Sequence, residues 1–274
     1  MTAVTSPRAG AVRAGSVRAL WAGNPQAVIE RGLRSARGGN LAVVVSGFFE
    51  PVLYLLSMGL GLGTLIGTVA VGGQEVPYAA YIAPALLAVS AMNGAIYDST
   101  WNVFFRLNYG RLYEGMLATS LGPLDVALGE ILYALLRGLV YATGFMIIMQ
   151  LLGLNLAWTA LLALPAVMMI AFGFASLGMA VTSYMKTFQQ MDWINIILLP
   201  MFLFSATLFP ITQYPGWVQG VIMAFPLWHG VELVRGLTTG ILTSGMWVHL
   251  AYYAVMIVVG LFFTTRRMRA LFLD

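Results

Sequence analysis

The chain has 274 residues, of which 60% are hydrophobic and 9% are charged, and its fourteen basic and ten acidic residues leave a net charge of +4. Soluble domains carry about 25% charged residues, so this composition excludes an ordinary soluble protein and predicts an integral membrane protein. There is no cysteine, which excludes disulfide bonds and thiolate metal sites.

The N-terminal region is too polar to cross a bilayer. Residues 1–16 mix glycine, alanine, serine, proline and arginine, a composition that predicts disorder. Residues 17–38 place apolar side chains on one helical face and arginines on the other, which predicts an amphipathic helix at the cytoplasmic membrane surface. With Arg31, Arg34 and Arg37, this helix is either a simple anchor or a contact surface for a cytosolic partner, and the sequence leaves both open.

Six apolar runs follow and make up most of the chain. They are apolar on all sides and do not alternate, which favours transmembrane helices over the strands of a barrel. A helix of about 20 residues crosses the hydrocarbon core. We therefore predict an all-α integral membrane protein with a transmembrane domain over residues 41–270 and six spans, at residues 41–70, 79–100, 124–152, 158–184, 194–209 and 247–265.

The basic residues predict how these spans are oriented. Twelve of the fourteen lie in segments on one side of the six-span arrangement, and the other two are Arg137 and Arg235. Because basic residues are enriched on the cytoplasmic side, we expect a multi-pass protein of the cell membrane with both termini in the cytoplasm. They form no basic stripe, so the net charge of +4 indicates orientation and not nucleic-acid binding.

Residues 104–119, between the second and third spans, are helical in composition and too polar to cross the membrane. They combine leucine, tyrosine and methionine with the charged Arg106, Arg111 and Glu114. The sequence Leu-Gly-Pro at 121–123 then ends the segment. This is either an ordinary cytoplasmic loop or a docking element, and its length and mixed charges favour a docking element.

Prolines divide the segment between the fifth and sixth spans. They leave two apolar pieces of ten and eleven residues within residues 216–237. Such pieces extend about 15–17 Å, half of the hydrocarbon core, and predict a pair of external re-entrant half-helices. Irregular backbone at membrane depth is tolerated where it lines a cavity. This segment is therefore a candidate part of a translocation path, with Pro210, Pro215, Trp217, Trp228, His229, Glu232 and Arg235 as its residues.

Charged residues also fall inside the predicted spans, where each costs several kcal/mol unless it is paired or hydrated. Glu130 and Arg137 are seven residues apart on one helical face, so we expect them to meet directly or through another helix. Glu50 has no residue of opposite charge nearby in its span. It is a further candidate for the translocation path.

His229, Glu232 and Arg235 follow one another at spacings of three, so they share one helical face. A His-x-x-Glu pair can hold a metal in a helical bundle. With two histidines in the whole chain, a hydrogen-bonded cluster that positions the half-helices is favoured over a metal site. The chain also lacks a catalytic constellation, and its single lysine, Lys186, lies outside any phosphate-binding loop. We expect no enzyme activity, no metal and no cofactor.

Four stretches carry a resemblance to the permease subunits of ABC-2 type exporters. They are residues 49–54 (FEPVLY) running into 59–63 (GLGLG), 113–119 (YEGMLAT), 203–210 (LFSATLFP), and 214–219 (YPGWVQ) followed by 225–229 (FPLWH). With the six-span layout, the chain resembles this family over about residues 17–270. It is most similar to the lipo-oligosaccharide (nodulation-factor) exporters and more distantly to daunorubicin-type drug-export permeases. Family members frequently have glycine where this chain has Ala206.

The resemblance implies partners and roles. The chain would be the permease of an ATP-driven exporter of a lipid-linked or amphiphilic cargo. Two permease protomers, alike or different, would act in the membrane lipid with two cytosolic ATPase subunits that bind ATP and Mg²⁺. Residues 17–38 would be the interface helix near the ATPase. Residues 104–119 would be the coupling helix, with Arg106, Arg111, Tyr113 and Glu114 at the ATPase.

Two other transport functions compete with this one. Drug or antibiotic efflux is the main alternative, since 16 methionines and 12% aromatic residues suit an adaptable binding surface as well as ordinary packing. A secondary transporter independent of ATP would show repeats and helix breaks at the midplane, whereas the break here is predicted on the external side. The sequence does not identify the cargo.

Overall fold

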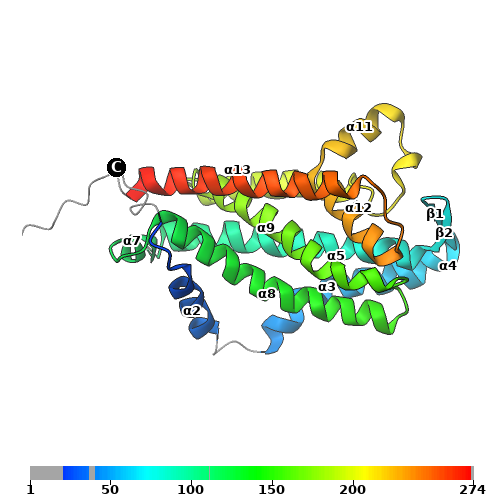
Figure 1. Ribbon diagram of the computed structural model, residues 1–274, viewed down its shortest axis with the longest axis horizontal. Coiled ribbons are helices and arrows are strands. Elements are labelled where there is room, and N and C mark those ends of the chain that lie inside the picture. The colour runs from blue at the N-terminus through cyan, green and yellow to red at the C-terminus, as the bar shows by residue number, and fades with distance from the viewer. Residues whose placement is uncertain (1–20, 37–40, 111, 273–274) are drawn as a thin grey trace, which may run out of the picture.

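The computed structural model describes residues 21–36, 41–110 and 112–272, which form a helical bundle (Figure 1). The predicted helical membrane architecture is confirmed. The α-helices are α2 (Pro25–Ala36), α3 (Leu41–Leu56), α4 (Gly63–Ile66), α5 (Tyr78–Tyr97), α6 (Val103–Asn108), α7 (Leu112–Leu117), α8 (Pro123–Leu151), α9 (Ala163–Thr182), α10 (Asp192–Leu203), α11 (Gly216–Ala224), α12 (Pro226–Thr239) and α13 (Met246–Phe272).

Helical turns of other types join or extend several of these helices. The π-helical turns Ser57–Leu62 and Asp98–Asn102 connect α3 to α4 and α5 to α6. Three short 3₁₀ turns, Trp158–Leu162, Phe188–Met191 and Ile211–Gln213, precede α9, α10 and α11. The first two continue directly into the following α-helix, so a helix here can be longer than its α-helical part.

Five helices in the described residues are long and apolar enough to cross a membrane. They occupy Phe49–Ile66, Tyr78–Asn108, Pro123–Leu151, Trp158–Thr182 and Met246–Leu271. The segment predicted as the fifth span, residues 194–209, differs, because α10 has 12 residues and ends at Leu203. With the 3₁₀ turn Phe188–Met191 that continues into it, the helix has 16 residues, 4 in the turn and 12 in α10, fewer than the roughly 20 of a full crossing. The backbone leaves the helix at Phe204, and Ala206 has a left-handed backbone with φ of 53°.

The first span also ends earlier than residue 70. Helix α4 stops at Ile66 because Gly67 has φ of 72°, and a hairpin of β1 (Thr68–Val71) and β2 (Gln74–Pro77) follows. The strands are antiparallel, with Val69 opposite Val76. Both residues of the turn, Gly72 and Gly73, have positive φ. The Gly-Gly pair between Val71 and Gln74 is the sequence signal for this hairpin.

The segment predicted as one coupling helix, residues 104–119, is divided. The second span continues through Asp98–Asn102 into α6 and ends at Asn108, and α7 is a separate helix of six residues. The N–H groups of Tyr109 and Gly110 both bond to the Phe105 carbonyl, which closes the helix. The first five residues of the predicted coupling segment, 104–108, are therefore part of a helix long and apolar enough to cross a membrane.

The centre of the bundle is α9, which packs against α13, α5, α8 and α12. Helices α9 and α13 approach closely at Gly260 of α13, where an added Cβ would lie 2.5 Å from the Ser176 Cβ and 2.6 Å from its backbone carbon. Figure 1 shows α2, α7 and the C-terminal end of α13 at one end of the bundle, and the hairpin and α11 at the other. The arrangement separates the candidate docking segments from the candidate half-helices.

Candidate functional site

Glu130 of α8 is the meeting point of two arginines from other helices. Its side chain is 5% exposed, and Arg31 Nη2 of α2 lies 2.8 Å from Glu130 Oε1. Arg106 of α6 forms a second ion pair with the other carboxylate oxygen. A buried carboxylate is costly unless it is paired and hydrogen-bonded, and two guanidinium groups meet that need. One side chain thus holds α2, α6 and α8 together.

Tyr113 brings α7 to the same place. It is completely buried, and burial raises the pKa of its hydroxyl above the ordinary value. Its electrostatic neighbours are Glu130, Arg106 and Arg31. Three of the predicted interface and coupling residues therefore converge on Glu130. Sequence reasoning expected Glu130 to meet Arg137 and did not identify these partners, because they lie on other helices.

Helix α2 is fixed to α8 by further contacts. The buried carboxylate of Asp125 accepts hydrogen bonds from the backbone N–H groups of Ala22 at 2.6 Å and Asn24 at 2.9 Å. It also accepts one from the N–H of Gly122, 2.9 Å away, at the start of α8. Val28 is buried against Gly129, which has no side chain to keep the helices apart. Of the predicted amphipathic helix, α2 is thus docked on α8 through Val28, whereas Leu33 is exposed.

The other predicted docking residues lie away from Glu130. Arg34 forms an exposed pair with Glu30 at 3.4 Å, a type of pair that adds little stability. Glu114 of α7 is exposed and forms no ion pair with the described residues. Arg37 and Arg111 lie outside the described residues, as does the segment 1–16 predicted to be disordered. The exposed charges of α2 and α7 remain available to a partner.

Arg137 does not meet Glu130. It forms an ion pair with Asp98, which also accepts a hydrogen bond of 2.8 Å from Asn102 Nδ2. The Asp98–Arg137 pair and the Arg106–Glu130 pair line one small polar cavity between the π-helical turn Asp98–Asn102, α6, α8 and α9. The two predicted partners are thus neighbours in one polar cluster, each bound to a different residue.

A cavity of about 770 Å³ lies beside this cluster, lined by α3, α5, α8, α9 and α10. Its surface is mainly apolar, with a few polar side chains, as in pockets for small molecules. Asp98 and Arg137 line both this cavity and the small polar one. The other polar lining residues include Glu50, Tyr54, Asn93, Tyr141 and Asn195. The cavity is therefore one layer of side chains away from Glu130.

The predicted path residues are divided between this cavity and the half-helices. Glu50 lines the cavity and forms no ion pair with the described residues. The other predicted path residues do not line the cavity; they are Pro210, Pro215, Trp217, Trp228, His229, Glu232 and Arg235. Pro210 and Pro215 flank the 3₁₀ turn before α11, and Trp217 is 78% exposed. The half-helices themselves are present as α11 and α12.

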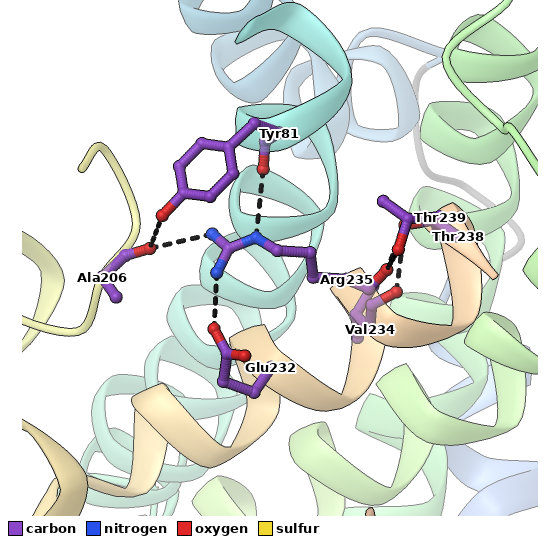
Figure 2. Close-up of polar contacts among 7 residues, drawn as sticks. All are labelled: Tyr81, Ala206, Glu232, Val234, Arg235, Thr238 and Thr239. Carbon is purple, nitrogen blue, oxygen red and sulfur yellow. Dashed lines mark hydrogen bonds and ion pairs between the residues drawn. The ribbon is translucent and has the colours of Figure 1, made fainter. Parts of the chain in front are cut away.

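The predicted cluster on α12 is present in part. Arg235 and Glu232 form an ion pair of 2.6 Å, and Figure 2 shows the guanidinium between Tyr81 of α5 and Ala206. His229 belongs to a different group. Its Nδ1 lies 2.7 Å from Nδ1 of His249 on α13, and Trp228 packs edge-on against both rings. The partners come from other helices, so helical spacing within α12 could not reveal them.

Ala206 gives a first prediction. A left-handed backbone costs a residue with a Cβ roughly 1–2 kcal/mol, whereas glycine adopts it freely. We expect Ala206→Gly to stabilise the protein by about 0.5–1 kcal/mol, after subtracting the larger unfolded-state entropy of glycine. The melting temperature of the detergent-purified protein, followed by tryptophan fluorescence, measures this. An unchanged or lower value would contradict it. Leu208→Gly, at a neighbouring residue without positive φ, is the control and should lower the melting temperature.

Comparisons with known proteins agree with this architecture. The model of the ABC-2 type transporter family matches residues 25–239. The chain is 31% identical to Nodulation protein J of Rhizobium leguminosarum bv. viciae over 245 residues, 89% of this chain and 93% of that protein. It is also 31% identical to Nodulation protein J of Rhizobium leguminosarum bv. trifolii, over 93% of this chain and 97% of that one. Against Nodulation protein J of Bradyrhizobium diazoefficiens the identity is 32%, over 80% and 83%.

Proposed function

The chain belongs to the ABC-2 type transporter family, and from that premise we propose that it is the membrane permease subunit of an ATP-driven exporter. A separate cytosolic ATPase subunit, in two copies, would bind ATP and Mg²⁺ and hydrolyse the ATP. Two permease protomers would form the path. In this proposal α2, α7 and the C-terminal end of α13 face the cytoplasm, and the hairpin and α11 face outward across the cell membrane.

The main support for the proposal is a series of charged contacts that connects α2 and α6 to the wall of the large cavity. Arg31 and Arg106 bind Glu130, and the Arg106–Glu130 and Asp98–Arg137 pairs line one small polar cavity. Asp98 and Arg137 then form part of the wall of the large cavity. A displacement of α2, α6 or α7 by a docked ATPase would therefore act on residues that line the cavity.

Energy coupling follows from differential affinity. ATP binding can shift the equilibrium between two conformations of the permease only as far as the ATPase binds those conformations with different affinities. We propose that closure of the ATPase pair moves α2 and α7, and that the Glu130 contacts transmit this movement to α8 and α5. The cavity would then alternate between an inward-open state and an outward-open one.

The cargo class rests on the sequence motifs and on the lining of the cavity. Apolar side chains from five helices would bind an acyl or other apolar chain, and the carboxylate, amide and hydroxyl groups of the lining would bind polar groups. We therefore propose an amphiphilic cargo similar to a lipo-oligosaccharide or glycolipid. The aromatic and methionine side chains in the lining, Trp101, Met168 and Phe202, keep drug efflux as the second candidate.

Co-purification tests the proposal. A C-terminal tag, mild solubilisation and mass spectrometry should recover a stoichiometric ATPase with the chain, and a second permease if the pair is heteromeric. Recovery of the chain alone, even after crosslinking, would contradict the proposal.

Glu114 gives a second prediction, on the docking surface. We expect Glu114→Gln to reduce ATPase recovery or to uncouple ATP hydrolysis from export, because it removes an exposed charge of α7. Glu75→Gln is the matched control, since Glu75 is equally exposed and lies in the hairpin at the opposite end of the bundle (Figure 1). Equal recovery and equal coupling in both variants would count against the assignment of α7.

A further inference from the structure

Arg235 of α12 is a fully buried cation whose donors reach three elements of the fold. Its side chain is 3% exposed. Nη1 donates to the Glu232 carboxylate at 2.6 Å, Nε to the Tyr81 carbonyl of α5 at 3.3 Å, and Nη2 to the Ala206 carbonyl at 2.8 Å (Figure 2). The guanidinium carbon also lies 3.9 Å from the centre of the Tyr81 ring.

These contacts make the position of Arg235 specific to arginine. Its guanidinium stays charged, and its planar fork presents donors in fixed directions, which a lysine ammonium does not. Glu232 is the single carboxylate in the cluster, so the remaining donors are satisfied by backbone carbonyls and by the face of a tyrosine ring. Movement of α5 or of the Ala206 turn away from α12 would leave a buried charge with unpaired donors, which is costly.

The Ala206 carbonyl is the central acceptor of the cluster. It accepts the Arg235 hydrogen bond and a second one of 3.0 Å from the Tyr81 hydroxyl. The left-handed backbone of Ala206 is part of the turn that brings this carbonyl to both donors. The turn lies directly after α10 and is buried at Ser205, Ala206 and Thr207. The end of α10 is therefore attached to α5 and α12 through one backbone oxygen.

The two elements attached in this way are walls of the large cavity. Leu198 and Phe202 of α10 and Leu86 of α5 line it. Tyr81 lies little more than one helical turn from Leu86, and Ala206 follows Phe202 by four residues, in the turn after α10. Arg235 thus connects α5 and α10 beside the end of the cavity that is nearer to α11 and α12.

Helix α12 has separate contacts with α13 at its other end. The Tyr253 hydroxyl donates to the Pro226 carbonyl at 2.8 Å, and His229 contacts His249 at 2.7 Å. The Tyr252 hydroxyl also donates to the carbonyl of Ala224, the last residue of α11, at 3.2 Å. Loss of the Arg235 contacts would therefore release the Ala206 turn and the end of α10, while α12 stays packed against α5 and α13.

We propose that Arg235 is a positioning residue that acts as a latch, holding α10 against α5 and α12 and closing the outer end of the cavity. The inference rests on the proposed export function, in which this end must open to release the cargo. Opening would transfer the two carbonyls from the guanidinium to water. No residue of the latch is expected to contact the cargo in the closed state.

A thiol-labelling experiment tests the latch. The chain has no cysteine, so a single introduced cysteine can report on its own position. Leu86→Cys, at a buried residue of the cavity wall, should react slowly with a membrane-impermeant maleimide added outside the cell. We expect Arg235→Met to raise this rate several-fold, in cells with or without the ATPase. Thr239→Val is the control, because Thr239 bonds to the backbone of α12 and leaves the guanidinium contacts intact.

A second reporter separates opening from unfolding. Val103→Cys, buried near the inner end of the same long helix, should stay unlabelled from outside in the Arg235→Met protein. If both reporters react, the Arg235→Met protein has unfolded. The Leu86→Cys labelling rate in the Arg235→Lys protein then tests the latch, because lysine keeps the charge but lacks the planar guanidinium fork. An unchanged Leu86→Cys rate in the folded variant would overturn the latch.

Nucleotide dependence supplies a readout that a merely structural role would not change. In vesicles that contain the ATPase, ATP should raise the Leu86→Cys rate of the otherwise unaltered chain, whereas the Arg235→Met rate should be high and independent of ATP. Labelling without the ATPase tests the latch alone, and recovery of the ATPase tests the export proposal alone. Failure of one is therefore distinguishable from failure of the other.

Discussion

Replacing Glu130 with glutamine is expected to abolish coupled export. The amide keeps the size of the side chain but removes the charge that both Arg31 and Arg106 bind. Breaking a buried ion pair costs about 3–5 kcal/mol, and the lower end applies here because the two arginine side chains are about one-third exposed and can be rehydrated. We expect export to fall at least tenfold, since about 1.4 kcal/mol already corresponds to a factor of ten.

Export from vesicles and the ATPase rate of the complex, with and without cargo, measure this effect. Glu130→Asp should restore part of the activity because it keeps the charge. Glu75→Gln is the control, since it removes an exposed carboxylate of the hairpin at the opposite end of the bundle, and it should leave export nearly unchanged. Full export by the Glu130→Gln protein would remove Glu130 from the coupling route.

Replacing Gly260 with alanine is expected to destabilise the whole bundle. The added Cβ would lie 2.5 Å from the Ser176 Cβ and 2.6 Å from the Ser176 carbonyl carbon, and backbone cannot move aside as a flexible side chain can. Overpacking of this kind costs about 1–3 kcal/mol. Alanine has the higher helix propensity, so a loss of stability would come from the contact with α9 and not from the helix itself.

The yield of monodisperse protein and its melting temperature measure this second effect. Gly138→Ala is the control, because a Cβ at Gly138 of α8 would meet no atom within 4 Å. We expect normal yield and an equal or slightly higher melting temperature for Gly138→Ala. Similar behaviour of the two variants would mean that α13 and α9 are not in tight contact at Gly260.

Much of the helical architecture is predictable from the sequence because local rules determine it. The third and fourth spans were expected at residues 124–152 and 158–184, and the helices run over Pro123–Leu151 and Trp158–Thr182. A proline begins the first of these, and apolar residues fill both. The starts of the two half-helices were equally predictable, because Pro215 immediately precedes α11 and Pro226 is the first residue of α12.

The departures arise where tertiary contacts or turn geometry decide. The short α10 ends in a turn whose carbonyl is bound by Arg235 and Tyr81, and apolar composition cannot show such an ending. The second span runs on to Asn108, past the point where composition becomes polar, because Arg106 finds its carboxylate on α8. A charged residue that is paired inside the protein looks, in the sequence, like the end of a span.

The ion pairs themselves were the least predictable part of the site. Arg31 and Glu130 are 99 residues apart, and Arg137 and Asp98 are 39 apart. Helical spacing predicts only neighbours on one helix, and on that basis Glu130 and Arg137 were expected to meet. The resemblance to exporter permeases named residues 17–38 and 104–119 as docking segments, but not Glu130, which binds an arginine from each of them.

The left-handed backbone of Ala206 affects the relative populations of the open and closed states of the latch. If the turn relaxes when the latch opens, the cost of a left-handed alanine is present in the closed state alone. A difference of about 1 kcal/mol changes a two-state ratio roughly fivefold. Relative to a chain with glycine here, this protein would populate the open state more often and reopen sooner after each cycle. One methyl group would then set the resting balance of the transporter.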